Sequence, residues 1–114
     1  MGMLVQGQWI DDDGKSRGEG GKFDHLPTSF RSHITIGGAS GFKAESGRYY
    51  IYGSRTCPWA HRTLIFRSLK KLDNAISVSL ALPGRHPEGW TFGDDPDYPD
   101  CIPDTINGFE YLHQ

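Results

Sequence analysis

The sequence has only two cysteines among its 114 residues, Cys57 and Cys101, which lie 44 positions apart. So few thiols, in a chain that lacks the basic start and apolar run of an export signal, exclude the disulfide framework of small secreted domains. No apolar run approaches the roughly 20 residues that a membrane-spanning helix needs. We therefore expect a cytoplasmic protein with two separate thiols and no membrane partner.

A strong charge of one sign is also missing, because 12 Lys and Arg residues and 14 Asp and Glu residues leave a formal net charge of −2. Residues 43–71 carry seven basic residues against the single acid Glu45, while residues 94–104 carry five aspartates and no base. So mixed a pattern does not favour nucleic acid as a partner. It fits an anionic small ligand near the basic part, or plain solubility, and it predicts a solvated loop over residues 94–104.

Metal-ligand spacing is absent as well. A zinc site takes four Cys, His or acidic ligands, which commonly occur as closely spaced pairs. The five histidines show no metal-ligand spacing with each other or with the cysteines; they are His25, His33, His61, His86 and His113. We therefore expect no metal site.

Glycine and proline are plentiful, with 15 and 7 residues, so much of the chain should be loop. The length and the 36% hydrophobic content allow at most one domain with a modest core. Residues 11–47 are polar and Gly-rich with scattered apolar side chains. We expect residues 1–47 to form an extended N-terminal lead-in and residues 48–114 to form the folded part.

Regular structure is expected in the middle of the chain. The aromatic and β-branched run at residues 48–53 predicts a strand, and residues 76–80 alternate as a second strand would. Between them Pro58 suits the first position of a helix, which we expect to continue to residue 72. A further helix is expected to begin within residues 106–114. Strand, helix and strand in this order indicate a right-handed parallel crossover in an α/β sheet.

The expected helix has an apolar stripe. Ile65, Leu69 and Leu72 recur at helical spacing, whereas most of the basic residues lie elsewhere on the helix. The pattern predicts an amphipathic helix. Asp73 and Asn74 are expected to end it.

Cys57 lies where the first strand gives way to the helix. Unpaired backbone N–H groups and the helix dipole stabilise an anion there, which favours the thiolate of a cysteine, and Arg55 and Arg62 would add to this effect. The fourth position of a Cys-x-x-Cys pair is Ala60, so a second thiol must come from another molecule, for which glutathione is the cytosolic candidate. The alternative is a buried, inert cysteine.

Other candidate residues carry weaker signals. His61 lies four residues after Cys57 and could pair with its thiolate, but a histidine in a first helical turn more often packs or donates a hydrogen bond. Cys101 lies among acids in a Pro-rich loop that disfavours its thiolate, so we expect it to be incidental. Trp90 lies outside any periodic element and suits either the wall of a ligand pocket or a cover over the core.

The run Cys-Pro-Trp-Ala-His-Arg at residues 57–62 follows an aromatic strand, and Gly-Trp-Thr-Phe follows at residues 89–92. Together these runs resemble the glutathionyl-hydroquinone reductases, the Xi class of glutathione transferases. The resemblance extends to further runs at residues 20–23, 30–31, 62–65, 76–79 and 106–112.

The family fold that this resemblance implies is a thioredoxin-like domain followed by an all-helical domain. The chain is then expected to form an incomplete thioredoxin-like domain of the α/β class, with residues 48–114 as a partial glutathione-binding domain and the helical C-terminal domain absent. The resemblance implies that Cys57 is the catalytic cysteine and that Trp90 packs on glutathione. It also implies a homodimer in complete family members, and we expect this chain to associate through exposed edges.

The implied activity is the reduction of glutathionyl-hydroquinones to hydroquinones through a mixed disulfide between Cys57 and glutathione, which a second glutathione resolves. One alternative is a general glutathione transferase or a deglutathionylating monothiol oxidoreductase. Another is a catalytically inactive truncated fragment, which binds glutathione weakly or serves as an interaction module.

Overall fold

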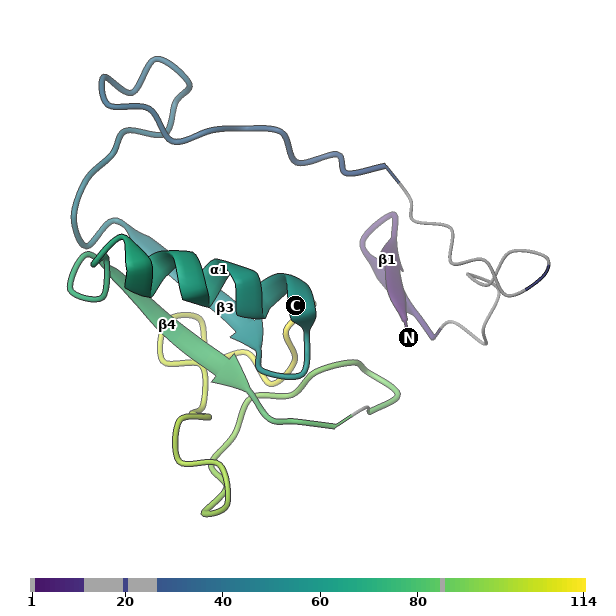
Figure 1. Ribbon diagram of the computed structural model, residues 1–114. Coiled ribbons are helices and arrows are strands. Elements are labelled where there is room, and N and C mark those ends of the chain that lie inside the picture. The colour runs from purple at the N-terminus through teal and green to yellow at the C-terminus, as the bar shows by residue number, and fades with distance from the viewer. Residues whose placement is uncertain (1, 12–19, 21–26, 85) are drawn as a thin grey trace.

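The computed structural model describes residues 2–11, 20, 27–84 and 86–114. Residues 21–23, part of the run that carries the resemblance, lie outside this range. Figure 1 shows two separate pairs of strands, an antiparallel hairpin near the N-terminus and a parallel pair in the middle of the chain. The elements are β1 (Met3–Val5), β2 (Gln8–Ile10), β3 (Tyr49–Ser54), α1 (Pro58–Leu69) and β4 (Ile76–Ala81).

Strands β3 and β4 are parallel and pair without a break, from Tyr49 opposite Ile76 to Ser54 opposite Ala81. Helix α1 connects them and lies across one face of the pair (Figure 1). The predicted strand, helix and strand of an α/β unit are therefore confirmed. Because the strands are parallel, their carboxyl ends meet at one edge of the sheet.

The N-terminal hairpin was not predicted by the sequence analysis, which placed residues 1–47 in an extended lead-in. Gln6 and Gly7 connect β1 to β2 with φ angles of 51° and 79°. Two successive positive φ angles are typical of a tight hairpin turn, for which Asn-Gly is the usual signal. Gln-Gly is a weaker signal, so the hairpin is hard to predict locally. The division between residues 47 and 48 stays a prediction.

Helix α1 starts at Pro58 as predicted but ends at Leu69, before Leu72. Lys71 adopts a left-handed φ of 54°, and the N–H of Leu72 donates to the carbonyl of Arg67 at 2.9 Å. This is the Schellman arrangement that closes many helices, usually around a glycine. A lysine in that place gives no sequence signal for the earlier end.

Arg67 fixes the connection from α1 to β4. Its guanidinium donates to the carbonyl of Ile76 at 2.6 Å, to the carbonyl of Asp73 at 2.9 Å and to the Asp73 carboxylate at 2.7 Å. One side chain thus holds the last turn of the helix against the first residue of β4. The short connection sets where the second strand begins.

The predicted apolar stripe of the helix is left largely exposed. Ile65 and Leu69 remain 46% and 70% exposed, and the half-buried side is formed by Ala60 and Leu64 instead. A Cβ on Gly53 would lie 3.2 Å from that of Ala60, so β3 and α1 approach closely where both residues are small. Apolar side chains lie on several sides of α1, and a two-stranded sheet covers only one of them.

The core is small. The buried apolar residues described by the structure are Leu80, Ala81, Phe92 and Cys101. The radius of gyration is 16.0 Å, whereas a compact domain of this length would have about 13 Å. Phe30, in the described part of the lead-in, is 94% exposed. Among the described helices none is long and apolar enough to span a membrane.

The helix expected within residues 106–114 is not formed, and turns occupy this stretch instead. The Asp104 carboxylate, which is 6% exposed, accepts the backbone N–H groups of Ile106 at 2.9 Å and Phe109 at 3.2 Å. Such bonds alone could start a helix, but Gly108 has a left-handed φ of 71°. A right-handed helix cannot contain this φ, so the chain forms a turn instead.

The expected solvated loop is formed by residues 96–100, which are exposed, but the last aspartate of the predicted range, Asp104, is buried. The Tyr52 hydroxyl donates to Asp104 Oδ1 at 2.7 Å, which ties the loop to β3. Burial raises the pKa of the Asp104 carboxyl, but the hydrogen bonds from Tyr52 and the backbone outweigh it and bring this pKa to about 2. Burial, followed by the bond to Asp104, raises the pKa of Tyr52 to about 12.

Replacing Asp104 by Asn should remove an acid-sensitive part of the stability. A carboxyl with a pKa of about 2 in the folded state and of about 3.9 when unfolded stabilises the fold above about pH 4, and this contribution is lost as the pH falls toward 2. We expect Asp104→Asn to lower the midpoint of urea unfolding at pH 7 and to weaken its fall between pH 5 and pH 2.5. Asp94→Asn, at an exposed aspartate, is the control. Equal acid sensitivity of Asp104→Asn and wild type would contradict this account.

Candidate functional site

The turn from β3 to α1 is built on Ser54, which is fully buried. Its carbonyl accepts the N–H of Cys57 at 3.1 Å. Its hydroxyl lies 2.8 Å from the Thr56 hydroxyl and accepts the Thr56 N–H at 3.3 Å. Three hydrogen bonds from one residue therefore fix the short segment that presents Cys57.

Cys57 is the N-cap residue of α1, with an extended backbone at φ −95° and ψ 114°. The thiol is free, and the residue is half-buried. Its sulfur makes no capping hydrogen bond, and the first turn of α1 holds no acidic residue. The first N–H groups of a helix lack partners inside it and carry partial positive charge. The position can therefore stabilise negative charge on the sulfur.

The three basic residues that the sequence placed near Cys57 have other contacts. Arg55 forms an ion pair with Asp100, and the guanidinium of Arg62 lies 5.4 Å from the centre of the Trp59 ring. His61 donates its backbone N–H to the Cys57 carbonyl at 2.9 Å, as any helix residue would. Among the described contacts none joins the His61 imidazole to the sulfur.

Cys101 is 3% exposed, and its thiol donates to the carbonyl of Ala81 at 3.4 Å. Burial raises the pKa of this thiol, and the nearby Asp100 and Asp95 add to the rise against the effect of Arg55. Cys101 is a packing residue beside β4. The two cysteines therefore have different roles, with Cys57 the accessible thiol.

Trp90 is half-buried and is held through its backbone. Its carbonyl accepts the N–H of Leu112 at 2.9 Å, and the next residue, Thr91, pairs with Tyr111 in an antiparallel bridge. On its other side, Gly89 closes a tight turn with His86 through hydrogen bonds of 2.9 and 3.2 Å. The position of Trp90 thus depends on the preceding turn and on the C-terminal segment.

Cys57 and Trp90 lie at the same edge of the parallel sheet. Cys57 follows the end of β3 at Ser54, which is paired with the end of β4 at Ala81. The residue after Ala81 donates its N–H to the carbonyl of Thr91 at 2.9 Å, so the segment that carries Trp90 lies beside the end of β4. Ligands of open α/β sheets bind outside the carboxyl ends of the strands, and both candidate residues lie there. Among the described contacts none joins the two side chains directly.

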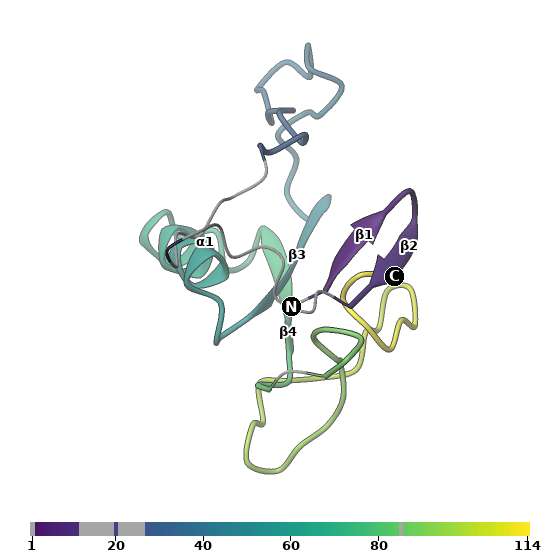
Figure 2. The ribbon, with the colours of Figure 1, turned by 90° about the vertical axis from the view of Figure 1, so that its right-hand side faces the viewer.

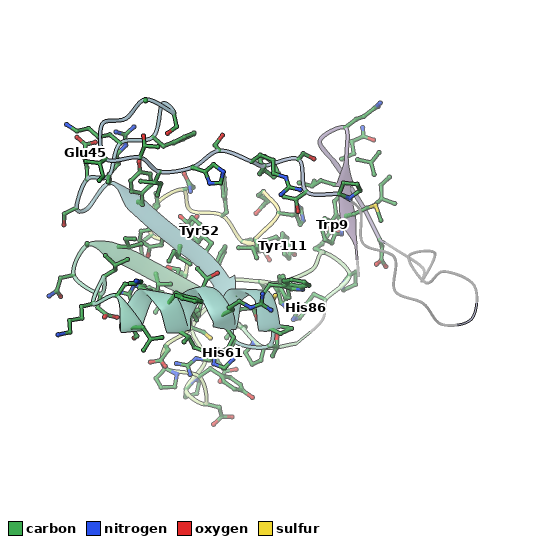
Figure 3. The ribbon with its side chains drawn as sticks, turned by 45° about the horizontal axis from the view of Figure 1, so that its top comes forward. Trp9, Glu45, Tyr52, His61, His86 and Tyr111 are labelled. Atoms are coloured by element: carbon green, nitrogen blue, oxygen red, sulfur yellow. The ribbon has the colours of Figure 1, made fainter. Side chains whose placement is uncertain are left out.

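An open groove of about 550 Å³ runs along α1. Arg55 and His61 contribute polar groups to it, and Leu64 and Leu69 contribute apolar ones; Figure 3 shows His61 on the outer side of the helix. Neither Cys57 nor Trp90 lines this groove. It is therefore separate from the candidate site.

No group of three or more His, Cys, Asp or Glu side chains is arranged to hold a metal ion within the described ranges. The arrangement at the carboxyl edge offers one accessible thiol, a helix N-terminus and an aromatic side chain. Such a set can perform thiol exchange through a single cysteine.

No protein-family model matches the sequence. Over its whole length, however, the chain is 43% identical to the glutathionyl-hydroquinone reductase YqjG of Escherichia coli, of which it covers 36%. The glutathione-bound structure of YqjG superposes with a TM-score of 0.67 at 44% identity, over 78% of this chain and 30% of that one. A Xi-class glutathione transferase from Natrialba magadii gives a TM-score of 0.74 at 38% identity, over 99% of this chain and 32% of that one.

The chain belongs to the glutathionyl-hydroquinone reductases, the Xi class of glutathione transferases. The match confirms the resemblance and the thioredoxin-like fold class that the sequence predicted. The chain spans about a third of the length of the relatives that it matches.

Two residues without a clear sequence signal hold the segments of the candidate site in place. Ser54 holds the turn of Cys57, and its only signal is a hydroxyl three positions before the cysteine. Trp9, in the N-terminal hairpin, donates its indole N–H to the carbonyl of Pro87, in the loop that precedes Trp90. No local pattern links residues so far apart in the sequence.

Replacing Ser54 by Ala should loosen the Cys57 turn. The substitution removes the two hydrogen bonds between the Ser54 hydroxyl and Thr56, and a typical hydrogen bond contributes about 0.5–1.5 kcal/mol to stability. We expect the free energy of unfolding, measured by urea titration, to fall by about this amount. Ser77→Ala, at an exposed residue of β4, is the matched control. If both variants are equally stable, the Ser54 hydroxyl does not hold the turn.

Proposed function

We propose that this chain carries the glutathione-accepting thiol of a glutathionyl-hydroquinone reductase, with Cys57 as the nucleophile and Trp90 as the residue that packs on glutathione. The observation that carries the proposal is the place of Cys57, an accessible free thiol at the N-terminus of the helix that follows a parallel strand. Ala60 stands where a dithiol enzyme has its second cysteine, so glutathione must supply the second sulfur.

The first step is attack by the Cys57 thiolate on the glutathione sulfur of a glutathionyl-hydroquinone. A sulfur–sulfur bond forms and the bond from sulfur to the aromatic ring breaks. The ring takes the electron pair and then a proton from solvent, and it leaves as hydroquinone. Cys57 and glutathione remain joined as a mixed disulfide, so the ring has been reduced and the two sulfurs oxidised.

In the second step the thiolate of another glutathione attacks the glutathione sulfur of the mixed disulfide. Oxidised glutathione leaves, and Cys57 returns to its thiolate. The N-terminus of α1 stabilises negative charge on Cys57 in both steps, when the thiolate attacks and when it leaves. The other groups at the carboxyl edge have to hold glutathione so that its sulfur meets Cys57.

Glutathione as the substrate is supported by the glutathione-bound structure of YqjG, which matches 78% of this chain. The role of Trp90 is inferred from the resemblance of residues 89–92. Trp90 is half-buried and lies at the same edge of the parallel sheet as Cys57. A cytoplasmic location, where reduced glutathione is plentiful, and a homodimeric assembly are parts of the same proposal.

A second candidate is glutathione binding without turnover by these 114 residues alone. It is favoured by the small core and by the exposed apolar side chains of α1, which include Phe66 at 56% exposure. Apolar surface of this kind is usually covered in a stable enzyme. Under this alternative, Cys57 still forms the mixed disulfide with glutathione, but hydroquinone release stays at background.

Incubation with glutathione disulfide, followed by peptide mass spectrometry, tests the proposal. We expect a glutathione adduct on Cys57 in the wild type and in Cys101→Ser, and none in Cys57→Ser, because Cys101 is buried. An adduct on Cys101 alone, or no adduct at all, would contradict the proposal. Single-turnover release of hydroquinone from a glutathionyl-hydroquinone, followed by chromatography, then separates the reductase from a protein that only binds.

A further inference from the structure

The N-terminal hairpin contacts the loop that precedes Trp90, through one side chain. The indole N–H of Trp9 donates to the carbonyl of Pro87 at 2.8 Å, across 78 positions of sequence. A Cβ on Gly89 would lie only 3.0 Å from the same indole, and Gly89 has a φ of 86°. A glycine at this position therefore lets the indole pack directly against the turn.

Trp9 also packs on the C-terminal segment. The His113 ring stacks on it with centroids 4.3 Å apart and planes 13° apart, and the Tyr111 ring stacks on His113 in turn at 5.7 Å. His113 Nε2 also lies 3.3 Å from the Glu88 carboxylate. Figures 2 and 3 show the hairpin beside the C-terminal segment, with the labelled Trp9 near Tyr111 and His86.

The two segments that Trp9 joins are the same two that fix Trp90. Trp90 directly follows Gly89, and its carbonyl accepts the N–H of Leu112, which lies between Tyr111 and His113. We propose that Trp9 is a positioning residue for Trp90. We call its contacts with Pro87, Gly89 and His113 the Trp9 clasp.

The Trp9 clasp stabilises the loop that precedes Trp90, which has few contacts of its own. The turn from His86 to Gly89 is closed by two backbone hydrogen bonds, and His86, Pro87 and Glu88 are exposed. Short exposed loops of this kind open locally at low cost in free energy. An indole packed between the loop and the C-terminal segment removes these open states, so the Trp90 ring is held in place before glutathione arrives. Trp9 itself takes no part in the proposed chemistry.

The role of Trp90 toward glutathione rests on the proposed function, whereas the clasp does not, so the test needs two readouts. The first is amide hydrogen exchange, measured by NMR without glutathione. In Trp9→Ala the Leu112 amide should exchange about tenfold faster or more, because its bond to Trp90 opens more often. The Leu80 amide in β4 should stay protected, which shows that the fold survives.

The second readout is the rate at which glutathione disulfide modifies Cys57. Trp9→Ala should slow it by about tenfold, which corresponds to about 1.4 kcal/mol. Trp9→Phe keeps a stacking ring but loses the indole N–H, and it should fall between Trp9→Ala and the wild type. Alkylation of Cys57 by iodoacetamide, which needs no glutathione site, should keep its rate in both variants. Val5→Ala, at an exposed residue of the same hairpin, is the control.

Unchanged exchange at Leu112 in Trp9→Ala would overturn the clasp. Faster exchange with an unchanged rate of glutathione modification would overturn the positioning role, because Trp9 would then only attach the hairpin. A wild-type chain that forms no adduct defeats the proposed function, and in that case the exchange result alone decides the clasp.

Discussion

The arrangement around the candidate site depends on the hydrogen bonds of the buried Asp104 carboxylate. It accepts the hydroxyl of Tyr52 from β3 and the N–H groups of the turn that begins at Ile106. The segment after this turn runs back beside residues 90–92, where Phe92 donates its N–H to the carbonyl of Glu110 at 2.8 Å. One charged group, stabilised by several donors, thus connects β3 to the segment that holds Trp90.

Backbone geometry then brings the two candidate residues to one edge. The parallel pairing of β3 and β4 aligns the strand ends. Ser54 fixes the turn that presents Cys57. The bridge between Thr91 and Tyr111 fixes the segment that carries Trp90. Neither residue reaches its place through a contact with the other. The chemistry that this edge can support follows from an accessible thiol at a helix N-terminus, and its specificity depends on loops that the fold holds from outside.

The sequence predicts the parts that depend on neighbouring residues. An aromatic run, Pro58 and an apolar helix predict the β3–α1–β4 unit and place Cys57 at the start of the helix. The other parts depend on contacts between distant residues. By its neighbours in the sequence, Asp104 resembles a solvated acid. Its partner in the structure, Tyr52, lies 52 positions earlier in the chain. The same carboxylate also accepts N–H groups of the turn that stands in place of the expected C-terminal helix. Trp9 carries no local pattern that points to Pro87.

The central claim is that the carboxyl edge around Cys57 and Trp90 is a glutathione site. A glutathione titration of the isotope-labelled Cys57→Ser chain, followed by NMR, tests it most directly, because this variant can bind glutathione without forming a disulfide. We expect concentration-dependent shifts at the indole of Trp90 and at the backbone amides of residues 54–57, 59 and 60. Shifts confined to the groove along α1, around Leu64 and Leu69, or no shifts at all, would contradict it.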